Sequence, residues 1–217
     1  MSADPRGRSS SSYGVDPVSG SERARAIAAW AIAHPQGCLM PTPLSGRSLE
    51  LIAALPEPIA IHESMRGALR AQIDAHSMLV PGAAGLLSGK LARAADWSET
   101  DGFPAMPLLS DDGMGAAGPS SRLIARALRE NHPILLTGHL PAGSPGDLAH
   151  REGRADWIRM PTHPTLAGNV AIWEKAGRPA AIGHSCPAAD LDELLLHIPA
   201  LKAGCRTGNI FEVDGRA

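Results

Sequence analysis

The chain has 217 residues, of which 44% are hydrophobic and 19% charged, so it is long enough and apolar enough to fold around a real core in one or two domains. Its formal net charge of −2 and pI near 6.5 argue against wholesale, non-specific nucleic-acid binding but leave room for a local basic groove. The three cysteines are widely spaced, which is typical of reduced thiols in a cytoplasmic protein. The sequence has no apolar run long enough to span a membrane and no apolar N-terminal segment, so we expect a cytoplasmic protein without a membrane partner.

Residues 1–12 are polar and Ser-rich, and we expect them to be disordered. Beyond them, hydrophobic periodicity and Gly/Pro punctuation predict alternating helices and strands. In chain order, the predicted elements up to residue 110 are a helix over 21–33, a strand over 37–43, a helix over 48–55, a strand over 56–61, a helix over 66–75, two short helices and a loop over 77–105, and a strand over 106–110.

The Gly-rich stretch 111–121 is predicted to be a loop that leads into the next helix. The elements that follow are a helix over 122–131, a strand over 133–140, a turn over 141–154, a strand over 156–162, a helix over 164–177, a strand over 179–183, a helix over 187–198 and a strand over 207–213. This alternation predicts an α/β fold with crossover connections and a largely parallel sheet. Residues up to about 148 should form one layered αβα unit, whereas the rest should pack against something else.

Two of the nine histidines stand out. His163 lies between a predicted strand and a helix, and His184 directly follows the next strand. Because ligands collect at the carboxyl ends of strands in an open α/β sheet, the two imidazoles could converge there, and an imidazole can serve as a metal ligand or a general acid. Each could equally well do no more than hydrogen-bond its own loop. Six others, expected to be capping or solvated, are His34, His62, His76, His132, His150 and His197.

A second candidate site is the loop Gly118-Pro-Ser-Ser-Arg122, which enters a predicted helix. Free backbone N–H groups, the hydroxyls of Ser120 and Ser121 and the guanidinium of Arg122 suit a phosphate. Arg47, in Ser-Gly-Arg at the start of another helix, follows the same logic. The alternative is that the serines are ordinary helix caps.

Several separated motifs occur in one order along the chain. They are Ser-Tyr-Gly at 12–14, CLMPTPLSGRSLELI from Cys38, DDGMGAAGPSSRLIARAL from Asp111, ILLTGHLPAGSPG from Ile134, MPTHPTLAGN from Met160 and AIGHS from Ala181. Together they resemble the metallo-β-lactamase-fold nucleases of the β-CASP branch, the group that includes RNA 3′-end processing endonucleases and bacterial ribonuclease J. The resemblance implies a lead-in over 1–19, a β-CASP-like cap domain over 20–148 and a C-terminal segment of the metallo-β-lactamase domain over 149–217.

The resemblance also implies roles for two side chains. His163 would assist catalysis near the leaving group, and His184 would be a metal ligand, with zinc or, alternatively, manganese as the metal. Ser10 stands at about the place of the family's acidic residue, and the family's remaining metal ligands would precede Met1. We therefore expect a truncated hydrolase that binds the metal weakly or not at all and is inactive alone.

The parent activity implied is metal-dependent hydrolysis of phosphodiesters in RNA or single-stranded DNA, although a small-molecule substrate stays open. The alternative is a stand-alone, non-enzymatic module that binds nucleic acid or phosphate through the Gly118–Arg122 loop. Apolar surface left exposed where the other half would dock should favour self-association.

Overall fold

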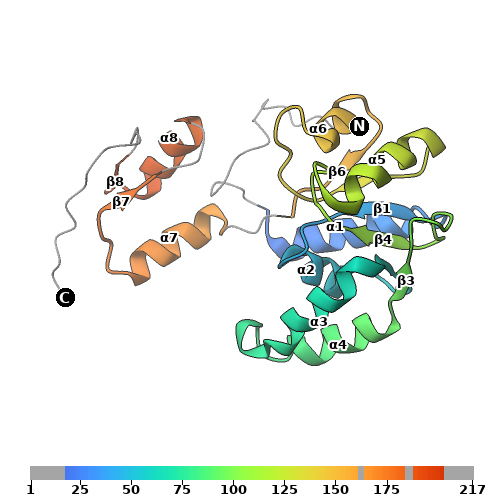
Figure 1. Cartoon of the computed structure of the whole chain (residues 1–217). Helices are drawn as coiled ribbons and strands as arrows, with labels where there is room; N and C mark the ends of the chain where they lie inside the picture. Colours follow the sequence, from blue (N-terminus) through green and yellow to red (C-terminus); the bar gives the residue numbers. More distant parts are fainter. Residues whose placement is uncertain (1–17, 161–163, 184–187, 203–217) are drawn as a thin grey trace. The chain divides into compact units, whose positions relative to one another are not determined.

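The computed structural model describes residues 18–160, 164–183 and 188–202 (Figure 1). It contains two compact units, one over Gly20–Thr162 and one that includes the described residues after 163. In both units helices alternate with short parallel strands, which confirms the predicted mixed α/β class. Within the described ranges, no helix is long and apolar enough to cross a membrane.

The first unit begins with a helix and then alternates. Its elements are α1 (Gly20–Ile32), β1 (Cys38–Pro41), α2 (Arg47–Ala54), β2 (Ala60–His62), the 3-10 helix η1 (Glu63–Met65), α3 (Arg66–Asp74), the 3-10 helix η2 (His76–Met78), α4 (Ala83–Arg93), β3 (Ala95–Trp97), β4 (Pro107–Ser110), α5 (Gly118–Glu130), β5 (Leu135–Leu136), α6 (Pro145–Arg151) and β6 (Asp156–Trp157).

All the strands of this unit run parallel. One sheet has the order β1-β4-β2-β3, and β5 pairs with β6. The N–H of Leu39 in β1 donates to the carbonyl of Pro133 at 2.9 Å, beside a parallel bridge between Leu39 and Ile134. The β5–β6 pair therefore continues the sheet beyond β1, which makes β5, β1 and β4 neighbours. Because the strands are parallel, their carboxyl ends lie at one edge, where the loops that lead into α2 and α5 leave.

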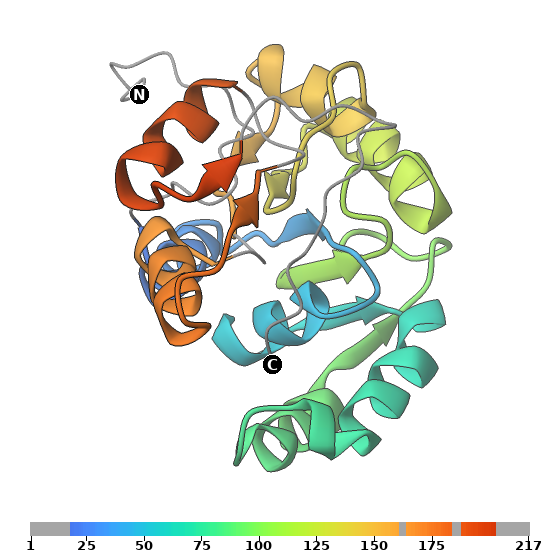
Figure 2. The same cartoon turned by 90° about the vertical axis from the view of Figure 1, so that its left-hand side faces the viewer.

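Helices cover both faces of the sheet (Figures 1 and 2), and alternate strand residues face the two layers. The side chains that pack with α1, α2, α3 and α4 are Met40, Ile61, Leu109 and Leu135. Those that pack with α5 and α6 are Leu39, Ala60, Leu108 and Leu136. All eight are at most 1% exposed, so every core strand is buried on both sides, as a parallel sheet requires.

The structure differs from the prediction in four places. The stretch 141–154, predicted to be a turn, contains the helix α6. Residues 77–105 hold one α-helix, α4, and the strand β3 rather than two short helices and a loop. Helix α5 begins at Gly118 with Pro119 in its first turn, so the end of the predicted 111–121 loop is helical. The unit also extends beyond residue 148, which lies inside α6, because β6 pairs with β5.

The second unit contains α7 (Leu166–Lys175), β7 (Ala181–Ile182), α8 (Ala188–His197) and β8 (Leu201–Lys202). Thr165 caps α7 by accepting the N–H of Gly168, and Gly177, the predicted stop, has a φ of +84°. Leu191, Leu194 and Ile198 form a small buried cluster against which α7 packs. The strand predicted over 207–213 lies outside the described residues.

Candidate functional site

Three loops meet at the carboxyl edge of the sheet in the first unit. They follow the neighbouring strands β1, β4 and β5. A Cβ on Gly113 would lie 2.6 Å from Cδ of Pro43, and a Cβ on Gly138 would lie 3.8 Å from the carbonyl oxygen of Gly113. The N–H of Thr42 also donates to the Ser110 carbonyl at 2.8 Å. This close contact creates the kind of edge at which open α/β sheets bind ligands.

Arg47, predicted to bind phosphate, lies at this edge. It is the first residue of α2, and only 8% of it is exposed. A Cβ on Gly138 would come within 2.8 Å of Nη1 of Arg47, so the guanidinium packs directly against the glycine backbone. The structure thus brings a buried positive charge to the loops after β1 and β5.

Ser120 is occupied within the core. Its hydroxyl lies 2.6 Å from that of Ser110 at the end of β4, and both residues are fully buried. Its N–H donates to the carbonyl of Asp111 at 2.6 Å. These bonds tie the first turn of α5 to the end of β4, which is a structural role for a residue predicted to hold phosphate.

Ser121 and Arg122 also have partners inside the protein. The hydroxyl of Ser121 donates to the Gly118 carbonyl at 2.9 Å. The guanidinium of Arg122 binds both carboxylate oxygens of Glu99, at 2.5 and 2.9 Å. This pairing with Arg122 lowers the pKa of Glu99. Ser120, Ser121 and Arg122 therefore share one turn of α5, while Arg47 lies on another helix.

An unpredicted residue, Asp112, occupies the anion position before α5. Its carboxylate accepts the N–H groups of Met114 at 2.6 Å, Gly115 at 3.0 Å and Ala117 at 3.0 Å. Backbone N–H groups that converge in this way form a concave anion site. The loop has thus folded around a carboxylate of its own. The sequence signal is an aspartate followed by two nearby glycines, a combination that favours turns around an Asx side chain.

Asp111 links two of the loops. Burial raises the pKa of its carboxyl, and the neighbouring charge of Asp112 adds to the effect. A hydrogen bond with the backbone of Leu44 opposes the shift by favouring the ionised form. The loop after β4 therefore carries two adjacent acidic side chains, one held by the β1 loop and one by its own backbone.

The two predicted catalytic histidines, His163 and His184, lie outside the described residues, as does Ser10. Within the described part of the chain, no group of three or more His, Cys, Asp or Glu side chains could hold a metal ion. His62, predicted to be a capping histidine, does cap η1: its ring accepts the N–H of Ser64.

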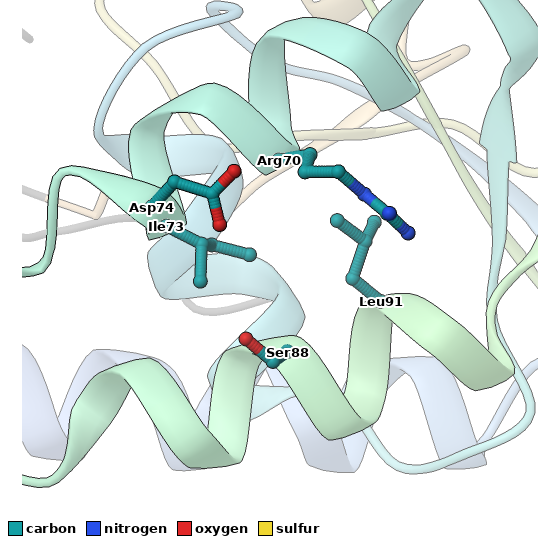
Figure 3. Close-up of a pocket in the computed structure, with 5 residues that line it drawn as sticks. All are labelled: Arg70, Ile73, Asp74, Ser88 and Leu91. Carbon is teal, nitrogen blue, oxygen red and sulfur yellow. The ribbon is translucent and has the colours of Figure 1, made fainter.

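A cavity of about 260 Å³ lies elsewhere, between α3 and α4. Figure 3 shows Arg70, Ile73 and Asp74 of α3 facing Ser88 and Leu91 of α4 across it. None of the predicted site residues lines this cavity.

Large apolar side chains are exposed between α3 and α4. Met78 is 84% exposed and Val80 is 75% exposed. Surface of this kind is compatible with association between molecules, and the predicted self-association stays a prediction.

No family model matches the chain, and no curated protein matches it either.

Proposed function

We propose that the Gly20–Thr162 unit holds the phosphodiester backbone of RNA or single-stranded DNA, as the β-CASP-like part of a metallo-β-lactamase-fold hydrolase. The observation that carries this proposal is the position of Arg47 at the carboxyl edge of the parallel sheet, where the loops after β1, β4 and β5 are in contact. The ordered motifs around Cys38, Asp111 and Ile134 supply the link to that family.

The chemistry of Arg47 supports phosphate recognition. A guanidinium is always charged, and its planar fork matches two phosphate oxygens at once. Its burial strengthens such a contact, because charges interact more strongly where water is excluded. Gly138 matters because its missing Cβ leaves the space that Nη1 of Arg47 fills. The guanidinium is therefore held in one place by the β5 loop.

The first unit is assigned to binding rather than to activation of water. Hydrolysis of a phosphodiester in this family needs metal-bound water, and the described residues offer no cluster that fits a metal. Zinc or manganese would be held through residues such as His184, with His163 beside the leaving group. Both assignments rest on the resemblance alone.

The binding step can be tested with fluorescently labelled single-stranded RNA and DNA of the same sequence. We expect Arg47→Gln to weaken binding. The slope of the logarithm of the binding constant against the logarithm of the salt concentration should become shallower by the contribution of about one phosphate contact. Arg129→Gln is the matched control, because it removes the same charge from an exposed position in the last turn of α5. Gly138→Ala keeps every charge but displaces the guanidinium, so it should also weaken binding.

The outcomes of these experiments distinguish a phosphodiester hydrolase from a non-enzymatic binding module. Equal affinity in Arg47→Gln, Gly138→Ala and Arg129→Gln would refute the phosphate site. Binding without cleavage in the presence of zinc or manganese would favour a non-enzymatic binding module. Cleavage that disappears in His163→Ala and His184→Ala would show a complete catalytic site and would refute the expectation that the chain is inactive alone.

A further inference from the structure

A second group of reactive side chains lies at the carboxyl ends of β2 and β3. His62 is the last residue of β2, Ser64 follows it in η1, and Glu99 comes two residues after β3. His62 is only 6% exposed, whereas Ser64 is exposed. The proposed phosphate site uses none of these three residues.

The hydrogen bonds of His62 fix the direction of proton movement. Nδ1 lies 2.8 Å from the hydroxyl of Ser64 and 3.3 Å from the N–H of Ser64. An N–H can only donate, so Nδ1 must offer a lone pair and the neutral ring carries its hydrogen on Nε2. The Ser64 hydroxyl then donates to Nδ1. On the other side of the ring, Nε2 lies 3.6 Å from Oε1 of Glu99.

The protein holds Glu99 as an anion beside this ring. Arg122 binds its carboxylate through two nitrogens, and Arg126 donates to its backbone carbonyl at 3.1 Å. The pairing with Arg122 lowers the pKa of Glu99, and the nearby His62 adds to the effect. Trp97 closes one side of the imidazole edge-on, with ring centroids 6.2 Å apart. The ring therefore sits between a hydroxyl donor and a fixed negative charge.

We propose that Ser64 is a nucleophile activated by His62 and Glu99, in a site that takes reactive carboxylic esters. The Ser64 oxygen attacks the ester carbonyl while its proton passes to Nδ1 of His62, and Glu99 stabilises the imidazolium. The alcohol or phenol then leaves with the proton from Nδ1, so that Ser64 carries the acyl group. Water gives up a proton to the same nitrogen and attacks the acyl group; the acid is released as the Ser64 oxygen leaves and takes the proton back from Nδ1, which restores the hydroxyl and the neutral ring.

The position of Ser64 in the fold favours this chemistry. It lies in the turn between a parallel strand and a helix, because η1 runs directly into the nine-residue helix α3. The start of a helix carries partial positive charge, which stabilises the negative oxygen that forms during attack. The exposure of Ser64 gives an ester access, while the burial of His62 keeps the base in place.

The test uses the full chain and two probes. A fluorophosphonate should form one covalent adduct, which peptide mapping places on Ser64, and p-nitrophenyl acetate should release p-nitrophenol. Ser64→Ala should abolish both reactions. Ser88→Ala is the matched control, because Ser88 is also exposed at the surface but has no histidine hydrogen-bonded to it in the described structure, and it should react like the parent chain.

Two further variants test the relay itself. His62→Gln should slow adduct formation by about 10²-fold or more, the usual contribution of a general base. Glu99→Gln should cause a smaller loss, with far-UV circular dichroism confirming that each variant is folded. The proposal is overturned if Ser64 carries no adduct, or if the folded His62→Gln and Glu99→Gln variants react at the parent rate. In that case His62 only caps η1.

Discussion

Replacing Asp112 with alanine is the most direct test of how the loop before α5 is held. The carboxylate accepts three backbone N–H groups, from Met114, Gly115 and Ala117. Alanine removes both acceptor oxygens, and with them all three hydrogen bonds, and leaves the glycines of the loop in place. We therefore expect the loop to lose its ordered shape and the first unit to lose stability.

The magnitude follows from the burial of the three bonds. The bonds from Met114 and Gly115 are partly buried, whereas the bond from Ala117 is exposed, so water replaces the last one most easily. A hydrogen bond to a charged group contributes about 1.5–3 kcal/mol, and an anion near a helix start adds about 0.3–1 kcal/mol. Because water recovers part of this energy, we expect Asp112→Ala to lower the free energy of unfolding by about 3 kcal/mol.

Urea unfolding followed by circular dichroism measures the loss, and amide hydrogen exchange locates it. The N–H groups of Met114 and Gly115 should exchange faster in Asp112→Ala than in the parent chain. Asp101→Ala is the matched control, since the Asp101 carboxylate accepts a single exposed bond, from the Ser98 N–H at 3.3 Å. If Asp112→Ala costs no more than Asp101→Ala and leaves the exchange rates unchanged, the carboxylate does not organise the loop.

Three further predictions concern the first unit. Burial raises the pKa of Cys38 to about 12, so peptide mapping should find this thiol unalkylated until the chain unfolds. Burial lowers the pKa of His132 below 6.5, so the folded state favours the neutral ring. The free energy of unfolding should therefore be highest above pH 6.5 and fall on acidification. Urea unfolding at several pH values should show a smaller fall in His132→Phe than in the parent chain. Gly37→Ala should destabilise the unit by about 2 kcal/mol or more in the same assay, because its Cβ would lie 2.0 Å from the Pro104 oxygen and the residue has a φ of +91°. Gly67→Ala is the control: its Cβ meets open space, so this variant should be neutral or stabilising.

The alternation of helices and strands was predictable because the apolar runs and the hydrophobic periodicity of the sequence coincide with the residues that are buried. The strand at Cys38–Pro41 is an uninterrupted apolar run, and such runs are typical of strands buried on both faces. β3 was missed because Ala95 and Asp96 are exposed and Trp97 alone is buried, so neither apolar continuity nor alternation marks it. α4 was hard to recognise because Leu87 and Leu91 are its only buried residues.

The candidate site was less predictable, because its residues are defined by partners distant in sequence. The sequence shows that Ser120 stands at a helix start, but not that Ser110 ends the adjacent strand and shares a hydrogen bond with it. Arg122 is paired with Glu99 across 23 residues, from the far end of the sheet. The fold, rather than the residue type, decides which partner each of these groups binds.

The carboxylate of Asp112 has a consequence for where a phosphate can bind. A phosphate at the start of α5 would have to displace an internal anion that already accepts three N–H groups. It would also approach two adjacent acidic residues, and like charges in one place repel. Arg47 carries a positive charge, and its Nη1 packs against the backbone at Gly138. The loop at Gly118 is therefore filled by an internal carboxylate, and the proposed phosphate site rests on Arg47 instead.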